Sequence, residues 1–115
     1  MNRSDIEDFD KDVSESQRIV AKYPEYVPVI VKSNKINLKK RKFLVPKDVN
    51  ISYLLIAIRK HIENVKHDTG IFIFCNNNLL GSNSMMGEIY EKHVCSIQNK
   101  NLFLYIDITT ENTFG

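Results

Sequence analysis

The chain has 115 residues, of which 43% are hydrophobic and 26% charged, and its formal net charge is +2. This length and composition are typical of one globular domain, and the net charge is too small to indicate nucleic-acid binding by itself. No apolar run approaches the roughly 20 residues of a membrane-spanning helix, and the acidic, polar N-terminus lacks the apolar segment of a signal peptide. The sequence contains no internal repeat and no low-complexity segment.

Two short helices are predicted at the N-terminus. Ser4-x-x-Glu7 and Ser14-x-x-Gln17 are capping-box patterns, and each is expected to open a short helix. Tyr23-Pro24 ends the second, because the residue before proline is disfavoured in helical conformation. Residues 1–24 are therefore predicted to form a helical extension.

A β-hairpin and one long helix are predicted next. Val27–Val31 and Arg41–Val45 are apolar, β-branched runs joined by a short link, which is typical of a hairpin. Pro28 has no amide hydrogen, so the first strand must be irregular or at an edge there. Asn50 is expected to cap a helix from Ile51 to about Val65, because its apolar residues recur at helical period.

The last third of the chain predicts two more strands and one short helix. Ile71–Cys75 is apolar on both sides and is followed by three asparagines, which tolerate the left-handed backbone of a turn. Ser84 is a candidate cap for a short helix that ends near His93, and 94–101 is predicted to be a loop. Leu102–Ile108 is apolar enough for a strand buried on both faces.

This order of elements predicts an α+β fold. We expect a four-stranded mixed sheet with one main helix, a ubiquitin-like β-grasp, plus the two N-terminal helices. The last strand is expected at the centre of the sheet. Within a single domain of residues 1–115, residues 25–108 form the predicted core and 109–115 a flexible tail that ends on Gly115.

Thiols, histidines and glycines give no sign of a catalytic or metal site. Cys75 and Cys95 lack CxxC spacing, so we expect reduced thiols and no disulfide. Together with the three histidines they are alternatively readable as zinc ligands or a Cys/His pair, but they do not cluster at the required spacing. The glycines are scattered singly, without a phosphate-binding loop. We expect no metal and no cofactor.

Charge is distributed unevenly along the chain. Residues 5–12 are acidic, whereas residues 32–47 carry seven lysines and arginines and no acid. Such a run is usually a solvated face. It is alternatively a docking surface for acidic peptides or anionic lipid headgroups.

Several strings give the chain a family resemblance. It resembles the autophagy ubiquitin-like modifiers of the GABARAP type, in the family's order and over nearly the whole chain. The strings are Lys22–Val31 (KYPEYVPVIV), Lys40–Pro46 (KRKFLVP), Ile58–Lys60 (IRK), Ile71–Asn77 (IFIFCNN), Met86–His93 (MGEIYEKH), Phe103–Ile106 (FLYI) and Glu111–Gly115 (ENTFG). The chain departs from the family pattern at Tyr26, Lys32, His61 and Leu80–Ser82, positions expected to affect partner choice rather than the fold.

The resemblance implies a protein tag, not an enzyme. Its C-terminal glycine, Gly115, would be joined to phosphatidylethanolamine by activating and conjugating enzymes and released by deconjugating enzymes. Glycine suits this role because it has no Cβ to hinder a close approach. The implied location is the cytoplasm, and the autophagosomal membrane after lipidation. The alternatives are a β-grasp peptide-binding module that is never conjugated and, far behind, an RNA-binding module that uses Lys39–Lys42, Phe43 and Tyr53.

The resemblance also implies a peptide-docking site along the second strand. A receptor peptide with an aromatic-x-x-aliphatic motif would pair with Lys42–Leu44. The implied aromatic pocket uses Glu15, Ile19, Pro28, Lys42 and Phe103. The implied aliphatic pocket uses Phe43, Val45, Pro46 and Leu54, with Val49 and Ala57 as further members. Arg59, Phe72 and Phe74 are implied contacts for enzymes or other partners.

Overall fold

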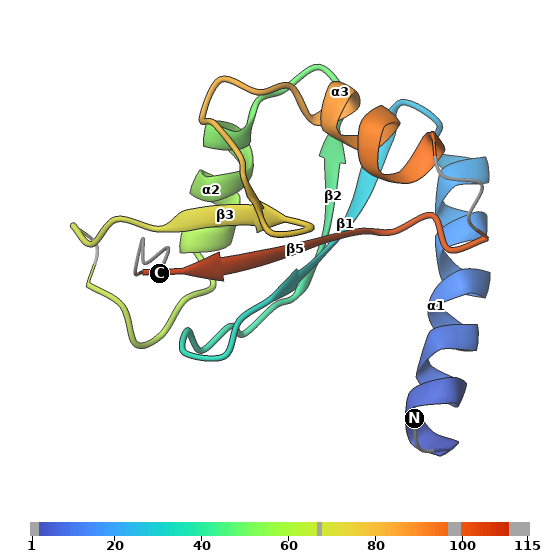
Figure 1. The fold of residues 1–115 in the computed structure, drawn as a ribbon, viewed down its shortest axis with the longest axis horizontal. Coiled ribbons are helices and arrows are strands. Elements are labelled where there is room, and N and C mark those ends of the chain that lie inside the picture. The colour runs from blue at the N-terminus through green and yellow to red at the C-terminus, as the bar shows by residue number, and fades with distance from the viewer. Residues whose placement is uncertain (1–2, 67, 97–99, 111–115) are drawn as a thin grey trace.

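The computed structural model describes residues 3–66, 68–96 and 100–110, with side chains from residue 11 onward. Figure 1 shows the described elements around one twisted sheet. They are α1 (Arg3–Lys22), β1 (Tyr26–Lys32), β2 (Lys42–Pro46), α2 (Ile51–Arg59), β3 (Phe72–Cys75), β4 (Asn78–Leu79), α3 (Met86–Tyr90), the π-helical turn η1 (Glu91–Cys95) and β5 (Leu104–Thr109).

The sheet has the order β2-β1-β5-β3-β4, so the last strand is central, as predicted. β1 and β2 form the antiparallel hairpin, and β1 pairs with β5 in parallel. Pro28 is opposite Leu44 of β2, and the ladder with β5 starts one residue later, at Val29. Pro28 therefore pairs with β2 alone, so its side towards β5 is a local edge of the sheet, as expected for a residue without an amide hydrogen.

In the described part of the chain the sheet has five strands rather than the predicted four. Asn76 and Asn77 have φ angles of 49° and 66°, in the left-handed region expected of an asparagine turn. This turn reverses the chain so that the two-residue β4 pairs with the end of β3. A strand this short has no sequence period to reveal it, because a period of two needs several residues to be visible.

One continuous helix, α1, replaces the two predicted N-terminal helices. No glycine or proline interrupts its 20 residues, so nothing stops the helix before Lys22. The Oγ of Ser16 donates to the Val13 carbonyl at 2.9 Å, one turn back in the same helix. The prediction of a second cap at Ser14 was therefore wrong.

The predicted extension of the long helix to Val65 was also wrong, because α2 ends at Arg59. The residues that follow leave the helix and pair with the loop before β2. Lys39 donates its amide to the His61 carbonyl at 2.8 Å, and Leu38 and Ile62 form an isolated β-bridge. These backbone hydrogen bonds substitute for the next turns of helix. At the other end, Asn50 caps α2 as predicted, accepting from the Tyr53 amide at 3.1 Å.

Two smaller predictions fail near the third helix. Met85, not Ser84, precedes α3, and no side chain caps it. The backbone of Ser84 is already engaged, since its carbonyl accepts from the amide of Ile51 at 3.0 Å. Val94 is buried in η1 rather than lying in a loop. β5 also includes Thr109, one residue beyond the predicted core, and residues 111–115 of the predicted tail lie outside the described part of the chain.

Helices contact both faces of the sheet. On one face α2 contributes Ile51, Leu54 and Ile58 to the main core, together with inward-facing residues of β1 and β5 such as Val29 and Ile106. On the other face α1 packs beside Lys42 and Tyr105. Within the described residues, no helix is both long enough and apolar enough to cross a bilayer.

Candidate functional site

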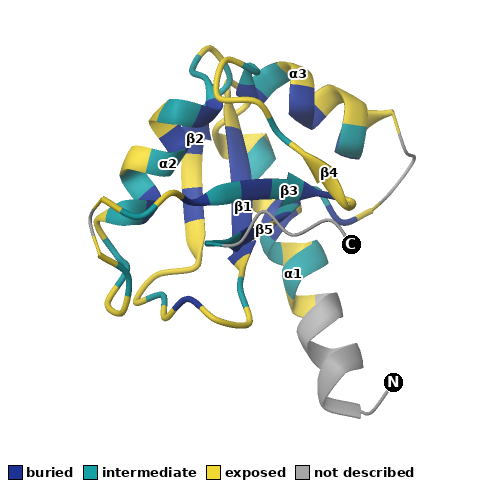
Figure 2. Cartoon of the chain, turned by 60° about the vertical axis from the view of Figure 1, so that its left-hand side comes forward, coloured by how far each residue is buried: buried dark blue, intermediate teal, exposed yellow. Residues whose placement is uncertain are grey.

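The edge strand β2 is the structural basis of the candidate site. Lys42 and Leu44 are exposed, whereas Phe43 and Val45 are buried, so the side chains alternate between the two faces of the sheet, as the burial colours of Figure 2 illustrate. β2 ends the sheet on this side, and a strand in this position presents backbone groups that can pair with a further strand. Each face of β2 then meets a different set of side chains.

On the α1 face, the ammonium of Lys42 in β2 pairs with two acids of α1. Its Nζ is 2.8 Å from Glu15 Oε2 and 3.9 Å from Asp12 Oδ1. The same ammonium lies 5.6 Å from the centroid of the Phe103 ring, within cation–π range. The structure therefore brings together three of the five residues expected for the aromatic pocket. Pro28 is fully buried, on the same face of the sheet as Lys42, and Ile19 is half-buried on α1.

Tyr105 extends this cluster, and the sequence analysis did not find it. Its hydroxyl donates to Asp12 Oδ2 at 3.0 Å and accepts from Asn101 Nδ2 at 2.7 Å. Burial raises the pKa of Tyr105 to about 12, with the hydrogen bond to Asp12 acting in the same direction. The ring lies edge-on to Phe103, with centroids 6.3 Å apart. The neutral phenol thus connects α1 to β5 behind the Lys42 pair.

Two hydrogen bonds, one part-buried and one exposed, fix α1 against the segment before β5. The amide of Leu102 donates to the Oγ of Ser16 at 2.9 Å, and Gln17 Nε2 donates to the Lys100 carbonyl at 3.0 Å. Ser16 is fully buried, which makes its hydrogen bonds costly to lose. Asp12, Glu15 and Ile19 therefore have a defined position beside β2. Helical spacing would have placed Asp12 next to Glu15, had the sequence analysis predicted one continuous helix.

On the α2 face, the residues expected for the aliphatic pocket are mostly core. Leu54 is fully buried, and Phe43 and Val45 are 8% and 2% exposed. The ring of Phe43 is covered by His61 at 5.7 Å and by the Lys40 ammonium at 5.0 Å. Pro46, Val49 and Ala57 are half-buried. A ligand reaches the ring of Phe43 only if this cover moves, so the accessible part of the pocket is its rim.

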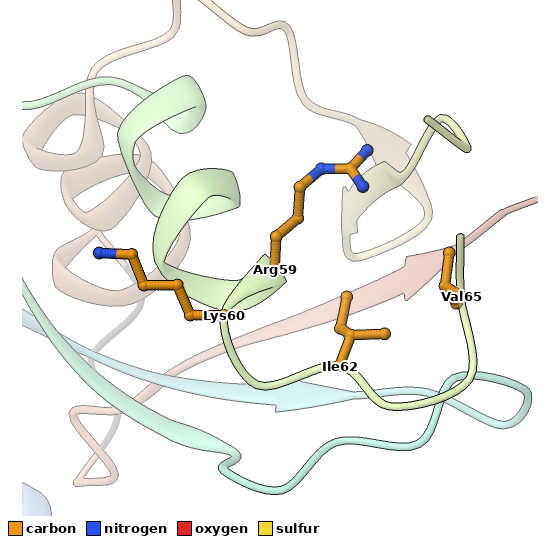
Figure 3. Close-up of a pocket in the computed structure, with 4 residues that line it drawn as sticks. All are labelled: Arg59, Lys60, Ile62 and Val65. Atoms are coloured by element: carbon orange, nitrogen blue, oxygen red, sulfur yellow. The ribbon is translucent and has the colours of Figure 1, made fainter. Parts of the chain in front are cut away.

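The expected partner contacts do not form one site. Arg59 is at the end of α2, where its Nη2 donates to the Thr69 carbonyl at 2.6 Å. It lines a hollow of about 430 Å³ with Lys60, Ile62 and Val65, drawn in Figure 3. Phe72 and Phe74 alternate in β3 with the core residue Ile73, and so face the opposite side of the sheet.

The two thiols are not arranged for nucleophilic chemistry. Burial raises the pKa of Cys75, with the Asp107 carboxylate adding to the effect. Burial also raises the pKa of Cys95, assisted by Glu91. Both thiols are therefore less ionised near neutrality than an ordinary cysteine. Among the described residues, no group of three or more His, Cys, Asp or Glu side chains is placed to hold a metal ion.

Comparison with known proteins decides the family. Residues 11–115 match the model of the family described as "Autophagy protein Atg8 ubiquitin like". The chain belongs to the Atg8 family. It is 38% identical to Autophagy-related protein 8e of Arabidopsis thaliana, over 100% of this chain and 97% of that one. It is 40% identical to Autophagy-related protein 8 of Schizosaccharomyces pombe, over 93% and 88%.

Solved Atg8 structures share the fold. The crystal structure of Trypanosoma brucei ATG8 has a TM-score of 0.77 to this chain at 27% identity, over 93% of this chain and 91% of that one. Plasmodium falciparum Atg8, in complex with a Plasmodium falciparum Atg3 peptide, has a TM-score of 0.74 at 26% identity, over 99% and 100%. These similarities confirm the predicted ubiquitin-like fold and the resemblance to the autophagy modifiers.

Proposed function

We propose that this Atg8-family chain is a protein tag, not an enzyme, which is joined through Gly115 to phosphatidylethanolamine and recruits receptors to autophagosomal membranes. The observation that carries the proposal is the edge strand β2, whose exposed backbone is flanked by a cationic, aromatic cluster on one face and an apolar rim on the other. In a family of autophagy ubiquitin-like proteins, such an edge is suited to capturing peptides.

The receptor peptide adds a strand to β2. Its backbone pairs along Lys42–Leu44, and Lys42 attracts acids beside its aromatic anchor. Phe103 is 4% exposed, so the anchor contacts its ring once the Lys42 side chain moves aside. The aliphatic anchor packs on the rim formed by Pro46, Val49 and Ala57. That Plasmodium falciparum Atg8 accepts an Atg3 peptide supports peptide capture on this fold, and supports conjugation enzymes as partners of this chain.

Conjugation is tested by incubating the chain with ATP, activating and conjugating enzymes of an Atg8 pathway, and phosphatidylethanolamine vesicles. We expect a faster-migrating lipidated band that disappears with Gly115→Ala. Absence of the band with the unchanged chain contradicts conjugation by those enzymes. A band that persists with Gly115→Ala moves the attachment point away from the glycine. Peptide binding without a band leaves the alternative, a β-grasp module that is never conjugated.

Peptide capture is tested with a labelled aromatic-x-x-aliphatic peptide. Lys42→Glu should weaken binding by about tenfold, because a contact at the centre of a docking site typically contributes roughly 1–2 kcal/mol. Lys92→Glu makes the same change in net charge and serves as the control, because Lys92 lines a hollow with Asn78 and Leu79 of β4, at the opposite edge of the sheet from β2. Equal affinity of the two variants would remove β2 from the binding site.

A further inference from the structure

The end of β5 determines which face of the protein lies nearest to Gly115. Thr109 pairs with Phe72, and Thr110 then lines a hollow of about 250 Å³ with residues that include Lys35, Val65 and Lys66. Gly115 is the fifth residue after Thr110. A fully extended chain of that length spans at most about 18 Å. Whatever holds Gly115 therefore stays close to this end of the sheet.

A second hollow adjoins the first. It has a volume of about 430 Å³ and is lined by Arg59, Lys60, Ile62 and Val65, with Val65 shared between the two. In Figure 3 the guanidinium of Arg59 and the ammonium of Lys60 extend in different directions, and Ile62 and Val65 come from the segment that follows α2. Cationic heads beside small apolar groups match the interface of a bilayer, where phosphates lie above acyl chains.

The surroundings of these hollows are strongly basic. Lys35, Lys60 and Lys66 are exposed around them, and the loop before β2 adds Lys39, Lys40 and Arg41. Two acids lie in the described part of the segment from Arg59 to Thr69. One of them, Glu63, is 3.5 Å from Lys39, and the other is Asp68. A third acid, the exposed Asp107 of β5, lines a neighbouring hollow with Lys35. Basic side chains still outnumber these acids, which makes the face complementary to an anionic surface.

We propose that the tail-exit face, defined as Lys35, Arg59, Lys60, Ile62, Val65 and Lys66, lies against anionic lipid headgroups when the chain is attached to a membrane. The proposal rests on the proposed attachment through Gly115. The short reach of the chain after Thr110 favours a lipid surface over an acidic protein, because the tether itself brings this face to within a few Debye lengths of the phosphates. Lipid composition, and not attachment alone, would then set the orientation of the β2 edge towards its receptors.

The test attaches the chain chemically, so that its outcome does not depend on any conjugating enzyme. A Gly115→Cys chain is coupled to vesicles that contain a maleimide-headgroup lipid. Cys95→Ser removes the exposed thiol, and Cys75 is buried and can remain. Vesicles of phosphatidylcholine alone are compared with vesicles that also contain phosphatidylserine. Failure of enzymatic conjugation would leave this experiment unaffected.

Acetylation of lysines, measured by mass spectrometry, reports which face meets the membrane. On phosphatidylserine vesicles we expect Lys35, Lys60 and Lys66 to react about fivefold more slowly than on neutral vesicles, since one lysine near an anionic surface contributes about 1 kcal/mol. High salt should reverse the protection. Lys11 on α1 and Lys92 in η1 are internal controls, since Figure 1 shows both elements away from the arrowhead of β5.

A pair of charge-reversed variants separates local from net charge. With Lys60→Glu and Lys66→Glu together, Lys35 should lose its protection, whereas Lys11→Glu with Lys92→Glu should leave Lys35 protected. Equal reactivity of the lysines on both vesicle types overturns the proposal. Protection that appears with a soluble acidic peptide but not with anionic vesicles also overturns it, and assigns the face to a protein partner instead.

Discussion

The ion pairs between Lys42 and α1 predict that Glu15 and Asp12 compete with the acids of a receptor peptide for the Lys42 ammonium. A receptor acid that approaches Lys42 meets an ammonium already 2.8 Å from Glu15 and 3.9 Å from Asp12. Glu15→Gln keeps the length and shape of the side chain but removes its charge. It should therefore strengthen the binding of a peptide with acids beside its aromatic anchor.

The size of this effect follows from the exposure of the pair. The side chains of Lys42 and Glu15 are 50% and 27% exposed, so solvent screens their attraction. Ion pairs of this kind are typically worth roughly 0.2–1 kcal/mol. Releasing Lys42 should therefore improve affinity by about 1.4-fold to fivefold. Asp12→Asn should add less, because its distance to the ammonium is longer and its carboxylate also accepts from Tyr105.

Fluorescence anisotropy with two labelled peptides provides the measurement. One peptide carries acids beside the anchor and the other carries glutamines at the same positions. Glu15→Gln should improve only the first, and the gain should shrink at high salt. Glu88→Gln on α3 makes the same change in net charge at an exposed site and should alter neither affinity. An equal gain for both peptides, or no gain at low salt, would refute competition for Lys42.

Three further predictions concern stability, measured by urea unfolding. Leu54→Ala should lower the free energy of unfolding by about 2–5 kcal/mol, because Leu54 is fully buried. Leu44→Ala should change it little, because Leu44 is 41% exposed. Similar losses for the two variants would contradict the assigned core. Burial raises the pKa of Tyr90 from 10.0 to about 12, so the folded state holds this proton more tightly than the unfolded state. The stabilisation from Tyr90 is present below about pH 10 and is lost as the pH rises towards about 12. Tyr90→Phe should therefore make the free energy of unfolding fall less steeply with pH in this range. The same pH dependence in both proteins would refute the raised pKa. Asn77 has a φ of 66°, so Asn77→Gly should leave the free energy of unfolding nearly unchanged, whereas Asn77→Val should lower it by about 1–2 kcal/mol. Equal stability of the glycine and valine variants would refute the left-handed turn.

Local patterns were sufficient where one element decides its own structure. The hairpin of β1 and β2 could be predicted because β-branched runs with a short link leave few alternatives. The central position of β5 could be predicted from its apolar residues. The expectation that both of its faces are buried was wrong, because burial alternates along β5 and Asp107 is exposed. The cap at Asn50 and the asparagine turn followed from the chemistry of single side chains.

Predictions failed where distant segments compete for the same backbone groups. Ile62 and Val65 continue the helical period of α2, but the loop before β2 takes the backbone of His61 and Ile62 instead. Ser84 has the chemistry of a cap, but its carbonyl is already bound to Ile51. In each case a hydrogen bond with a distant part of the chain outweighed a local preference, which is worth about 1 kcal/mol or less per residue.

The sequence by itself determined the family, the α+β fold and the residues along β2, because these depend on motifs and on short-range periodicity. Only the tertiary structure decided which charges meet. It placed Asp12 and Tyr105 behind the Lys42–Glu15 pair, and it gathered Lys35, Lys60 and Lys66 around the end of β5. Electrostatic energies depend on distances in space and on burial, and residues separated by tens of positions acquire both only when the chain folds.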